Sequence, residues 1–391
     1  MVPNGWKLST IEEIASVSSG GTPSRKVPEY WNGNIPWVTT AEVHFETITD
    51  TAEKISVNGL ENSSAKLFPI DTILMAMYGQ GKTRGQVAKL GIEATTNQAC
   101  AAIVLEKNHD VEYYFQFLMS RYESIREMAN SGGQQNLSAG IVKSIQVPVP
   151  PLPEQKKIAQ ILSTWDQAIT TTEQLLANSQ QQKKALMQQL LTGKKRLHDQ
   201  NGQPFTGEWH KKELGKLLDY TQPTKFLVKS SEYSDDHQTP VLTAGKTFIL
   251  GYTNENFGIF DARNEPVIIF DDFTTASKFV DFPFKAKSSA MKILTAKEGV
   301  LIKYVFEAMQ MMNYPVGGHQ RHWISIFSNL VIPFPSIEEQ QKIAAVLTAV
   351  DNEINTLKQK LDHLKQEKKA LMQQLLTGKR RVKPEAEMAE Q

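Results

Sequence analysis

The sequence predicts an α+β protein in which two similar mixed α/β domains are separated by a long antiparallel two-helix coiled coil, with an internal pseudo-two-fold repeat. Three observations predict this fold class. A phrase of the chain occurs twice, each copy closes a long run without Gly or Pro, and short strand-like stretches precede each run. A long internal repeat is considered first because it sets the architecture. At 391 residues the chain has room for two to three domains.

The repeated phrase is KKALMQQLLTGKKR at Lys183 to Arg196 and KKALMQQLLTGKRR at Lys368 to Arg381. The copies begin 185 positions apart and differ only where Lys195 is replaced by Arg380. At the same spacing both copies share an upstream glycine pair, a Pro-x-Pro sequence and a Glu-Gln pair. We therefore expect two similar halves that end in the same element.

Each repeated phrase closes a run that favours one long helix. Glu154 to Thr192 and Glu339 to Thr377 contain neither Gly nor Pro, and a proline-rich segment precedes each of them. Gly193 and Gly378 follow, at the position where a left-handed C-cap is expected. The sequence thus predicts two helices with defined starts and ends.

The apolar residues of these runs recur in alternating steps of four and three, which is the spacing of a coiled-coil seam. In the first run polar Thr172, Ser179 and Lys183 interrupt the seam, which indicates that its middle packs against a partner. An apolar stripe of this length has to be covered, so we expect the helices to bury each other with one domain at each end. The expected seam consists of Ile158, Leu162, Trp165, Ile169, Leu176, Leu186 and Leu190 in the first helix and Ile343, Leu347, Val350, Ile354, Leu357, Leu361, Leu364, Leu371 and Leu375 in the second.

The segments before the two helices also begin alike, at Trp6 and Trp209, and each beginning is predicted to form a short amphipathic helix. Strand-like runs broken by turn residues follow: IPWVT, TILMAM and CAAIVL in the first segment, and PVLTA, PVIIF and AMKIL in the second. Each segment closes with a helix, a glycine pair and a strand that leads into the prolines. Because regular βα alternation is missing, these are α+β domains and not a doubly wound sheet.

These patterns predict the domain organisation. We expect the first domain at residues 1–150, the first helix at 151–196, the second domain at 197–335 and the second helix at 336–381. The acidic tail, residues 382–391, has no counterpart in the repeat and is expected to be disordered.

Composition narrows the class of protein. The formal net charge is +1, so binding to an acidic partner would depend on local basic patches. Cys100 is the only cysteine, which excludes an internal disulfide and fits a reducing cytosol. No stretch resembles a signal peptide, and no apolar run approaches the length of a membrane span, so neither secretion nor membrane insertion is indicated.

The order of these elements resembles the specificity subunit of type I restriction-modification systems. The resemblance rests on two variable domains that begin with Trp, on PLPEQKKIA and SIEEQQKIA at the helix starts, and on LMQQLLTGK at the helix ends. It covers essentially residues 1–381. It implies that each variable domain is a target recognition domain for one half of a bipartite, asymmetric DNA site. It also implies that the helices set the spacing of the half-sites.

The resemblance further implies partners that perform the chemistry. Two modification (methyltransferase) subunits would dock on the helices, hold S-adenosylmethionine, flip out an adenine and methylate it at N6. A motor-nuclease subunit that uses ATP and Mg can join them for restriction. For this chain the resemblance implies a non-catalytic, DNA-binding subunit of the bacterial or archaeal cytoplasm that binds no cofactor itself. The sequence agrees, because it lacks methyltransferase motifs such as NPPF or DPPY, a Gly-rich cofactor loop and a set of helicase motifs.

Two polar loops of the first domain are candidates for DNA contact. The AMYGQGKT stretch fits a relaxed phosphate-loop pattern, but glycines on both sides of the next residues leave little room for the helix that such a loop has to open. We therefore favour a loop that presents Lys82, Thr83 and Arg84 to DNA. The second loop follows a glycine pair, and its amide side chains suit adenine edges. Its candidates are Gln134, Gln135 and Asn136.

The second domain contributes a different set of candidates. Asp271 and Asp272 form a carboxylate pair, but no third ligand is spaced for Mg²⁺, and we expect them to orient neighbouring basic groups or to accept from cytosine N4. Two histidines after the glycine pair are too few for a zinc site. The DNA-binding candidates are Lys246, Thr274, Thr275, Lys278, His319, Gln320, Arg321 and His322.

Two alternative functions remain from the sequence. The first is a phosphate-loop ATPase built on Lys82, which predicts ATP binding by the isolated chain. The second is a coiled-coil adaptor without DNA sequence specificity, which predicts partner binding that is indifferent to DNA sequence.

Overall fold

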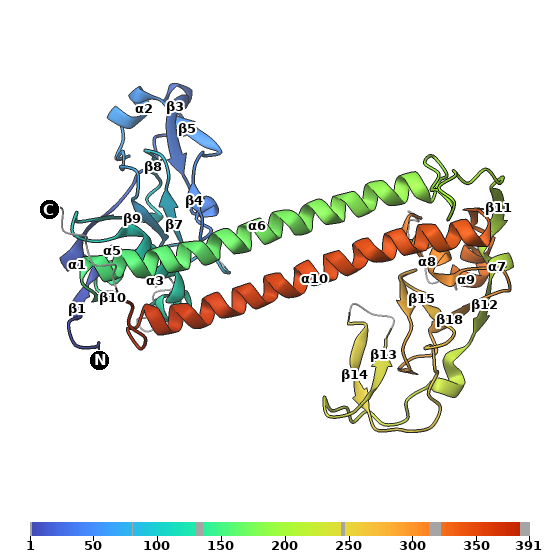
Figure 1. Ribbon diagram of the computed structural model, residues 1–391. Helices are drawn as coiled ribbons and strands as arrows, with labels where there is room; N and C mark the ends of the chain where they lie inside the picture. The colour runs from blue at the N-terminus through green and yellow to red at the C-terminus, as the bar shows by residue number, and fades with distance from the viewer. Residues whose placement is uncertain (1, 80, 130–135, 244–246, 313–321, 384–391) are drawn as a thin grey trace. The chain divides into compact units, whose positions relative to one another are not determined.

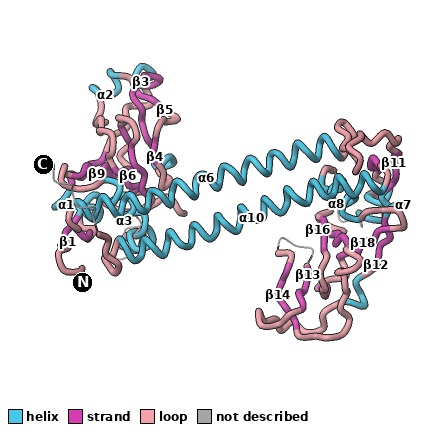
Figure 2. Tube along the Cα trace, in the orientation of Figure 1, coloured by secondary structure: helices cyan, strands magenta, loops and turns pink. Residues whose placement is uncertain are grey.

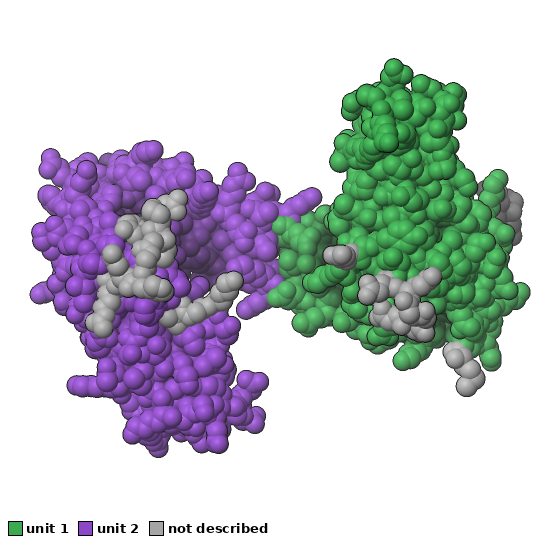
Figure 3. All heavy atoms as spheres, turned by 180° about the vertical axis from the view of Figure 1, so that it is seen from behind, with its two compact units in different colours: residues 1–173, 360–391 green, residues 174–359 purple. Residues whose placement is uncertain are grey.

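The computed structural model divides into two units, one formed by residues 1–173 and 360–391 and the other by residues 174–359 (Figure 3). Each unit therefore combines one globular domain with a part of each long helix. The structure describes residues 2–79, 81–129, 136–243, 247–312 and 322–383.

Both predicted long helices are present (Figure 1). Helix α6 spans Leu152–Leu190 and helix α10 spans Ile337–Leu375, each 39 residues long. Gly193 and Gly378 follow them with φ values of +71° and +72°, so the predicted left-handed caps are confirmed. Both helices begin two residues before the predicted start; α6 thereby takes a proline into its first turn, where the missing N–H has no helical partner to lose.

Within each unit the parts of α6 and α10 run antiparallel. In the first unit Lys365 lies 2.7 Å from Glu173, and Lys368 pairs with Asp166, so rising numbers on one helix meet falling numbers on the other. In the second unit Ser179 bonds to Glu353 and Lys183 lies 2.7 Å from Asp351, so here too rising numbers meet falling numbers. The side chains of the expected seam are all buried or half-buried.

The polar middle of the α6 seam is satisfied by the chain itself. Thr172 and Ser179 are only 3% and 5% exposed; the first hydroxyl donates to a carbonyl of its own helix, and the second donates to Glu353. Lys183 Nζ also lies 3.1 Å from the fully buried carboxylate of Glu307. Contacts within the chain therefore already satisfy these polar groups, and the packing of a partner on this stretch stays a prediction.

The start of each domain differs from the prediction. In place of an amphipathic helix, the first domain opens with strand β1 (Lys7–Thr10), which pairs antiparallel with β10 (Gln146–Val149), and only one helical turn, α1 (Ile11–Ile14), follows. The second domain repeats this arrangement. Pairing with a distant strand has overridden the local helical pattern, because the partner strand satisfies the backbone N–H and C=O groups that face it. The second set is β11 (His210–Glu213), α7 (Leu214–Leu217) and β19 (Val331–Phe334).

The main sheets of the two domains share the order of four strands, and the edge strand β4 of the first has no counterpart among the described residues of the second. The first is β2-β9-β6-β7-β4 and the second is β12-β18-β15-β16. The registers also correspond. The last residue of β6, Ala76, pairs with the first residue of β9, Cys100, and the last residue of β15, Asp271, pairs with the first residue of β18, Met291. The strands are β2 (Ala15–Ser19), β4 (Thr47–Ile48), β6 (Ile73–Ala76), β7 (Val87–Leu90), β9 (Cys100–Leu105), β12 (Leu218–Thr221), β15 (Val267–Asp271), β16 (Ser277–Val280) and β18 (Met291–Ala296).

A smaller three-stranded sheet completes each domain, and each mixes parallel with antiparallel pairs. The mixed α/β class is therefore confirmed, and Figure 2 shows the short strands of each domain in magenta. The first small sheet contains β5 (Glu53–Ile55), β3 (Trp31–Val38) and β8 (Thr95–Thr96), and the second contains β14 (Ile249–Thr253), β13 (Thr239–Leu242) and β17 (Lys285–Ala286).

The closing helices of each domain share a core with the long helices. In the first unit Tyr113 and Phe117 pack in one apolar cluster with Ile158, Leu162 and Leu375. The domain is thus anchored to its spacer by buried side chains. The remaining elements are α2 (Val57–Glu61), α3 (Val111–Ser120), α4 (Tyr122–Met128), α5 (Ala139–Lys143), α8 (Ile302–Gln310), α9 (His322–Ser325) and the 3₁₀ turns η1 (Pro28–Tyr30), η2 (Thr40–Glu42), η3 (Pro223–Phe226) and η4 (Phe327–Asn329).

A buried glutamate at the start of each long helix joins three segments of its unit. Glu154 accepts hydrogen bonds from the Trp6 indole at 2.9 Å and from the Arg381 guanidinium at 2.6 and 2.7 Å. In the second unit Glu339 accepts equivalent bonds, from an indole at 2.9 Å and from a guanidinium at 2.6 and 2.8 Å. The donors there are Trp209 and Arg196, so the repeated residues of the sequence form one repeated contact.

The glutamine that follows each of these glutamates joins the same junction to the closing helix. Gln155 accepts the N–H of Asp110, the N-cap of α3, at 2.9 Å and donates to the carbonyl of Pro150 at 2.8 Å. Gln340 makes the same pair of bonds with Leu301 and Pro335. The repeated Glu-Gln pair is therefore a structural joint.

The junction predicts a pH-dependent stability. Burial alone raises the pKa of Glu154, but hydrogen bonds from Arg381 and Trp6 outweigh it and lower the pKa below its usual 4.5. A lowered folded-state pKa adds stability that is complete above the unfolded pKa and is lost as the pH falls through the folded value. Glu154→Gln should therefore destabilise the chain by about 1–3 kcal/mol at pH 7.

Urea unfolding at a series of pH values measures this effect. The difference between wild type and Glu154→Gln should shrink as the pH falls below 4.5. The exposed Glu127 on α4 offers a control, since Glu127→Gln should leave the unfolding midpoint unchanged at pH 7. A difference that stays constant down to strongly acidic pH would contradict the role of the charge.

Candidate nucleic-acid interface

The loops that carry most of the predicted contact residues within the described part of the chain occupy the same place in the two domains. In the first domain the loop joins β6 to β7, and in the second it joins β15 to β16. Met77 donates to the carbonyl of Ala99 at 2.8 Å and accepts the N–H of Leu137 at 3.0 Å. Asp272 makes the same two bonds, with Ala290 at 3.3 Å and with His322 at 3.5 Å. Two unrelated loop sequences therefore leave equivalent strands at one equivalent point.

The first hairpin loop is shaped by glycines and braced by α4. Gly79, Gly81 and Gly85 all have positive φ, which side chains rarely tolerate, so the loop turns sharply. The Tyr122 hydroxyl donates to the carbonyl of Lys82, and Arg126 donates to the carbonyl of Gly81 at 2.7 Å. Two side chains of α4 thus hold the backbone of the loop in place.

The candidates on this loop differ in exposure. Lys82 is exposed, whereas Thr83 and Arg84 are half-exposed. Nothing in the predicted motif pointed to Tyr122 and Arg126, which lie far along the chain on a helix that looked purely structural. Their position behind the loop emerges only from the fold.

The geometry excludes the phosphate-loop alternative. A phosphate loop places the ligand at the N-terminus of a helix, whose free amides hold the anion. Here the chain runs from Ala76 through the loop into β7, which returns antiparallel to β6. The loop that contains Lys82 therefore opens a strand and lacks the helix that ATP binding of this kind requires.

One residue of the second candidate loop of the first domain, Asn136, lies next to a backbone contact with this hairpin. Asn136 is exposed, and its neighbour Leu137 donates to Met77 at the base of the hairpin loop. Asn136 therefore lies one residue from a backbone contact with the hairpin that presents Lys82. Gln134 and Gln135 lie outside the described residues.

The hairpin loop of the second domain is organised by a carboxylate. Asp271 accepts the N–H of Phe273 at 3.0 Å and the hydroxyl of Thr274 at 2.5 Å, and Thr275 has a φ of +60°. Thr274 is exposed and Thr275 half-exposed, and Lys278 is exposed on β16. These three candidates therefore share one hairpin.

His322 needs a correction, because it does not face solvent. Its side chain is fully buried, and Nδ1 lies 2.7 Å from the carbonyl oxygen of Asp272. The Asp272 carboxylate accepts the N–H of Trp323 at 2.9 Å and pairs with Lys292 at 3.0 Å. His322 thus holds the base of the hairpin instead of contacting a ligand, while Asp272 orients a basic group, one of its two expected roles. Lys246, His319, Gln320 and Arg321 lie outside the described residues.

Metal and membrane binding find no support in the part of the chain that is described. Among those residues no group of three or more His, Cys, Asp and Glu side chains is placed to hold a metal ion. Within the same residues no helix is both long and apolar enough to cross a membrane.

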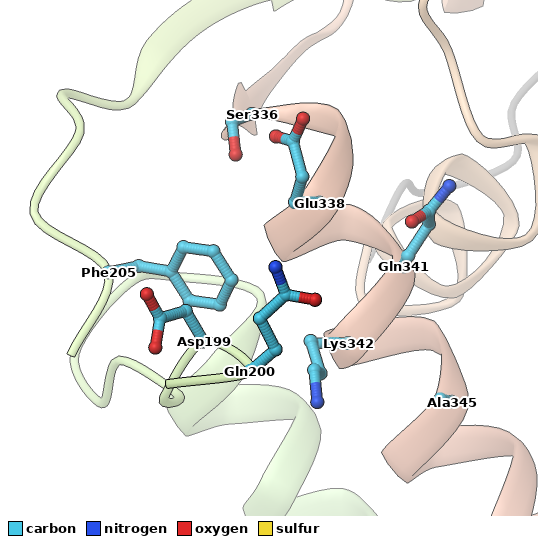
Figure 4. A pocket seen from close by; sticks show the side chains of 8 residues that line it. All are labelled: Asp199, Gln200, Phe205, Ser336, Glu338, Gln341, Lys342 and Ala345. Atoms are coloured by element: carbon cyan, nitrogen blue, oxygen red, sulfur yellow. The ribbon is translucent and has the colours of Figure 1, made fainter. Parts of the chain in front are cut away.

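A cavity of about 660 Å³ in the second unit lies apart from the predicted contacts (Figure 4). Asp199 and Phe205 line it from the segment between α6 and β11, and Lys342 lines it from the first turns of α10. No candidate DNA-binding residue contributes to its wall. The hairpins remain the better candidate site because they gather the predicted residues in both domains.

Comparison with known proteins identifies related chains. The family model described as type I restriction modification DNA specificity domain matches residues 3–178 and 206–366. The EcoR124I/EcoR124II specificity subunit of Escherichia coli is 51% identical over 141 residues, and that stretch spans 35% of either protein. The MjaIX specificity subunit of Methanocaldococcus jannaschii is 30% identical over 173 residues, which cover 39% of that protein.

Other similarities extend over nearly the whole chain. The MjaVIII specificity subunit of M. jannaschii is 24% identical over 419 residues, covering 98% of this chain and 94% of that protein. The crystal structure of a type I restriction-modification S subunit from M. genitalium matches with a TM-score of 0.64 at 14% identity, over 96% of this chain and 98% of that one. The fold therefore has a solved counterpart.

The exposed lysine on the first hairpin predicts a measurable change in DNA affinity. Replacing Lys82 with Ala should weaken binding to duplex DNA and reduce the slope of log affinity against log salt by about 1, because one phosphate contact is lost. Fluorescence anisotropy over a range of salt concentrations measures both quantities. Lys107, exposed beyond the opposite end of β9, offers a control, and Lys107→Ala should leave both unchanged. An unaltered salt slope in Lys82→Ala would remove this residue from the interface.

Proposed function

The chain belongs to the type I restriction modification DNA specificity family, and from that premise we propose that it is the sequence-specific DNA-binding subunit of a type I complex. One observation carries the proposal. Two domains share strand order and register, yet their equivalent hairpin loops have unrelated sequences. A constant frame with different loops is what two readers of different half-sites require. The site would be bipartite and asymmetric.

The hairpins supply suitable chemistry for such readout. Lys82, Thr83 and Lys278 suit phosphate oxygens, which position a protein on DNA. Arg84 suits the guanine edge, and Asn136 suits the adenine edge, both in the major groove. The hydroxyls of Thr274 and Thr275 can contact either a phosphate oxygen or a base edge. Base contacts would then give specificity, and lysine contacts would give affinity.

The helices would act as the spacer and the docking surface. We assign target recognition to residues 1–150 and 197–335, and spacing to residues 151–196 and 336–381. Cationic side chains along the helix pair, such as the half-buried Lys183 and the buried Lys368, would fix its register. The outer helix faces would bind two modification subunits.

Catalysis would belong to those partners. The modification subunits would hold S-adenosylmethionine and methylate adenine at N6, and a motor-nuclease subunit using ATP and Mg would add restriction. This chain would be non-catalytic and would act where the chromosome lies, in the cytoplasm of a bacterium or archaeon. The names of its relatives, which call them specificity subunits of type I restriction enzymes, support this division of labour.

Methylome sequencing of cells with and without the gene, in the presence of the modification subunits, tests the proposal. We expect N6-methyladenine at one split motif, two short half-sites with a fixed gap, and its loss on deletion. Methylation that does not depend on the gene would favour an adaptor without DNA specificity.

Helix length offers a second prediction. Inserting seven residues in both helices, at matched positions near their middle, lengthens each by about 10 Å. That length corresponds to roughly three base pairs. The methylated motif should therefore keep its two half-sites, while the gap between them grows by about three base pairs. Single-helix insertions serve as controls and should abolish methylation because the seams no longer match. An unchanged gap would refute the spacer role.

A further inference from the structure

Each hairpin exposes one aromatic ring at the same structural position. Tyr78 is 42% exposed and Phe273 is 51% exposed. Each directly follows the residue whose backbone makes the two equivalent bonds described above, Met77 in the first domain and Asp272 in the second. The rings are therefore structural equivalents, although the sequences around them, AMYG and DDFT, are unrelated.

This coincidence needs an explanation. Single exposed apolar side chains are common on protein surfaces, and one alone would carry no meaning. Here the two loops differ in length, and their other residues differ in type. This one position nevertheless carries a large aromatic side chain in both loops. Burial does not account for it, since neither ring belongs to an apolar core cluster.

The backbone beneath each ring is held in place. The N–H of Phe273 donates to Asp271, a carboxylate that is itself only 5% exposed. Tyr78 lies between Met77, whose N–H and carbonyl are both bonded, and Gly79, whose φ of +141° only glycine adopts freely. An aromatic ring on a fixed backbone loses little freedom on binding, which makes it an effective anchor.

The surroundings match a nucleic-acid ligand. Lys82 and Thr83 lie on the loop of Tyr78, and Thr274 and Lys278 lie on the hairpin of Phe273. A ring flanked by cationic and hydroxyl groups can contact an apolar base edge in the major groove, such as the thymine methyl group, while its neighbours hold the phosphates. A purely apolar partner surface would leave those polar groups without hydrogen bonds.

We infer that Tyr78 and Phe273 are a matched pair of specificity-determining residues, each of which places its ring against a base of its own half-site. The inference rests on the proposed function and deepens it by naming the contact that both domains share. The ring gives an apolar base contact, and the differing polar residues of each loop supply the remaining discrimination.

Substitutions at the two positions test the inference in cells that contain the modification subunits. Phe273→Ala and Tyr78→Ala remove the rings, whereas Phe273→Tyr and Tyr78→Phe keep them. Val331 on β19 and Leu67 in the first domain are equally exposed, 49% and 47%, and lie outside the hairpins, so their Ala variants serve as matched controls. The methylome gives the motif, and a duplex with the wild-type motif then gives the affinity of the purified complex.

We expect each Ala variant to lose about 10-fold in affinity for the wild-type motif and to accept additional bases in one half-site only, a different half for each variant. The ring-preserving variants and the controls should keep the motif. The inference is overturned if the Ala variants behave like the controls, if both relax the same half-site, or if they weaken binding to all DNA equally. If the wild-type complex methylates no split motif, the proposed function itself fails, which is a distinct result.

Discussion

A buried carboxylate at the start of each long helix is the contact on which the rest of the structure depends. Glu154 and Glu339 are 2% and 1% exposed, and an unpaired charge at such a place would be strongly unfavourable. Each is compensated by an indole N–H from the first residues of its domain and by a guanidinium that follows the C-terminal end of the other helix. One residue thus joins the beginning of a domain, the beginning of one helix and the end of the other.

That joint explains why the repeat takes the form it does. The arginine lies in the repeated phrase, the glutamate in the Glu-Gln pair, and the tryptophan opens the domain, so all three have to be kept for the contact to form. The neighbouring glutamine extends the joint to the N-terminus of the closing helix. With the ends of each domain fixed, the four shared strands of the main sheets keep corresponding registers, and the hairpin loops are free to differ without disturbing the frame.

Much of this architecture was predictable from local pattern. The absence of Gly and Pro between Glu154 and Thr192 and the terminal glycine predicted α6 to within two residues, because helix ends follow local rules. The opening strand β1 was missed because its pairing with β10 depends on residues far along the chain. His322 was misjudged for a related reason, since only the fold brings it beneath Asp272. The braces Tyr122 and Arg126, and the equivalence of Tyr78 with Phe273, likewise depend on tertiary contacts.

The central claim is that two equivalent hairpins read two separate halves of one DNA site. Photo-crosslinking tests it most directly, with a photoreactive amino acid at position 82 in the first hairpin or at position 274 in the second. The complete complex is bound to a duplex that carries its methylated motif, and the crosslinked nucleotides are mapped. The account predicts that position 82 marks one half-site and position 274 the other, separated by the gap. Crosslinks from both positions within one half-site, or none within the motif, would contradict it.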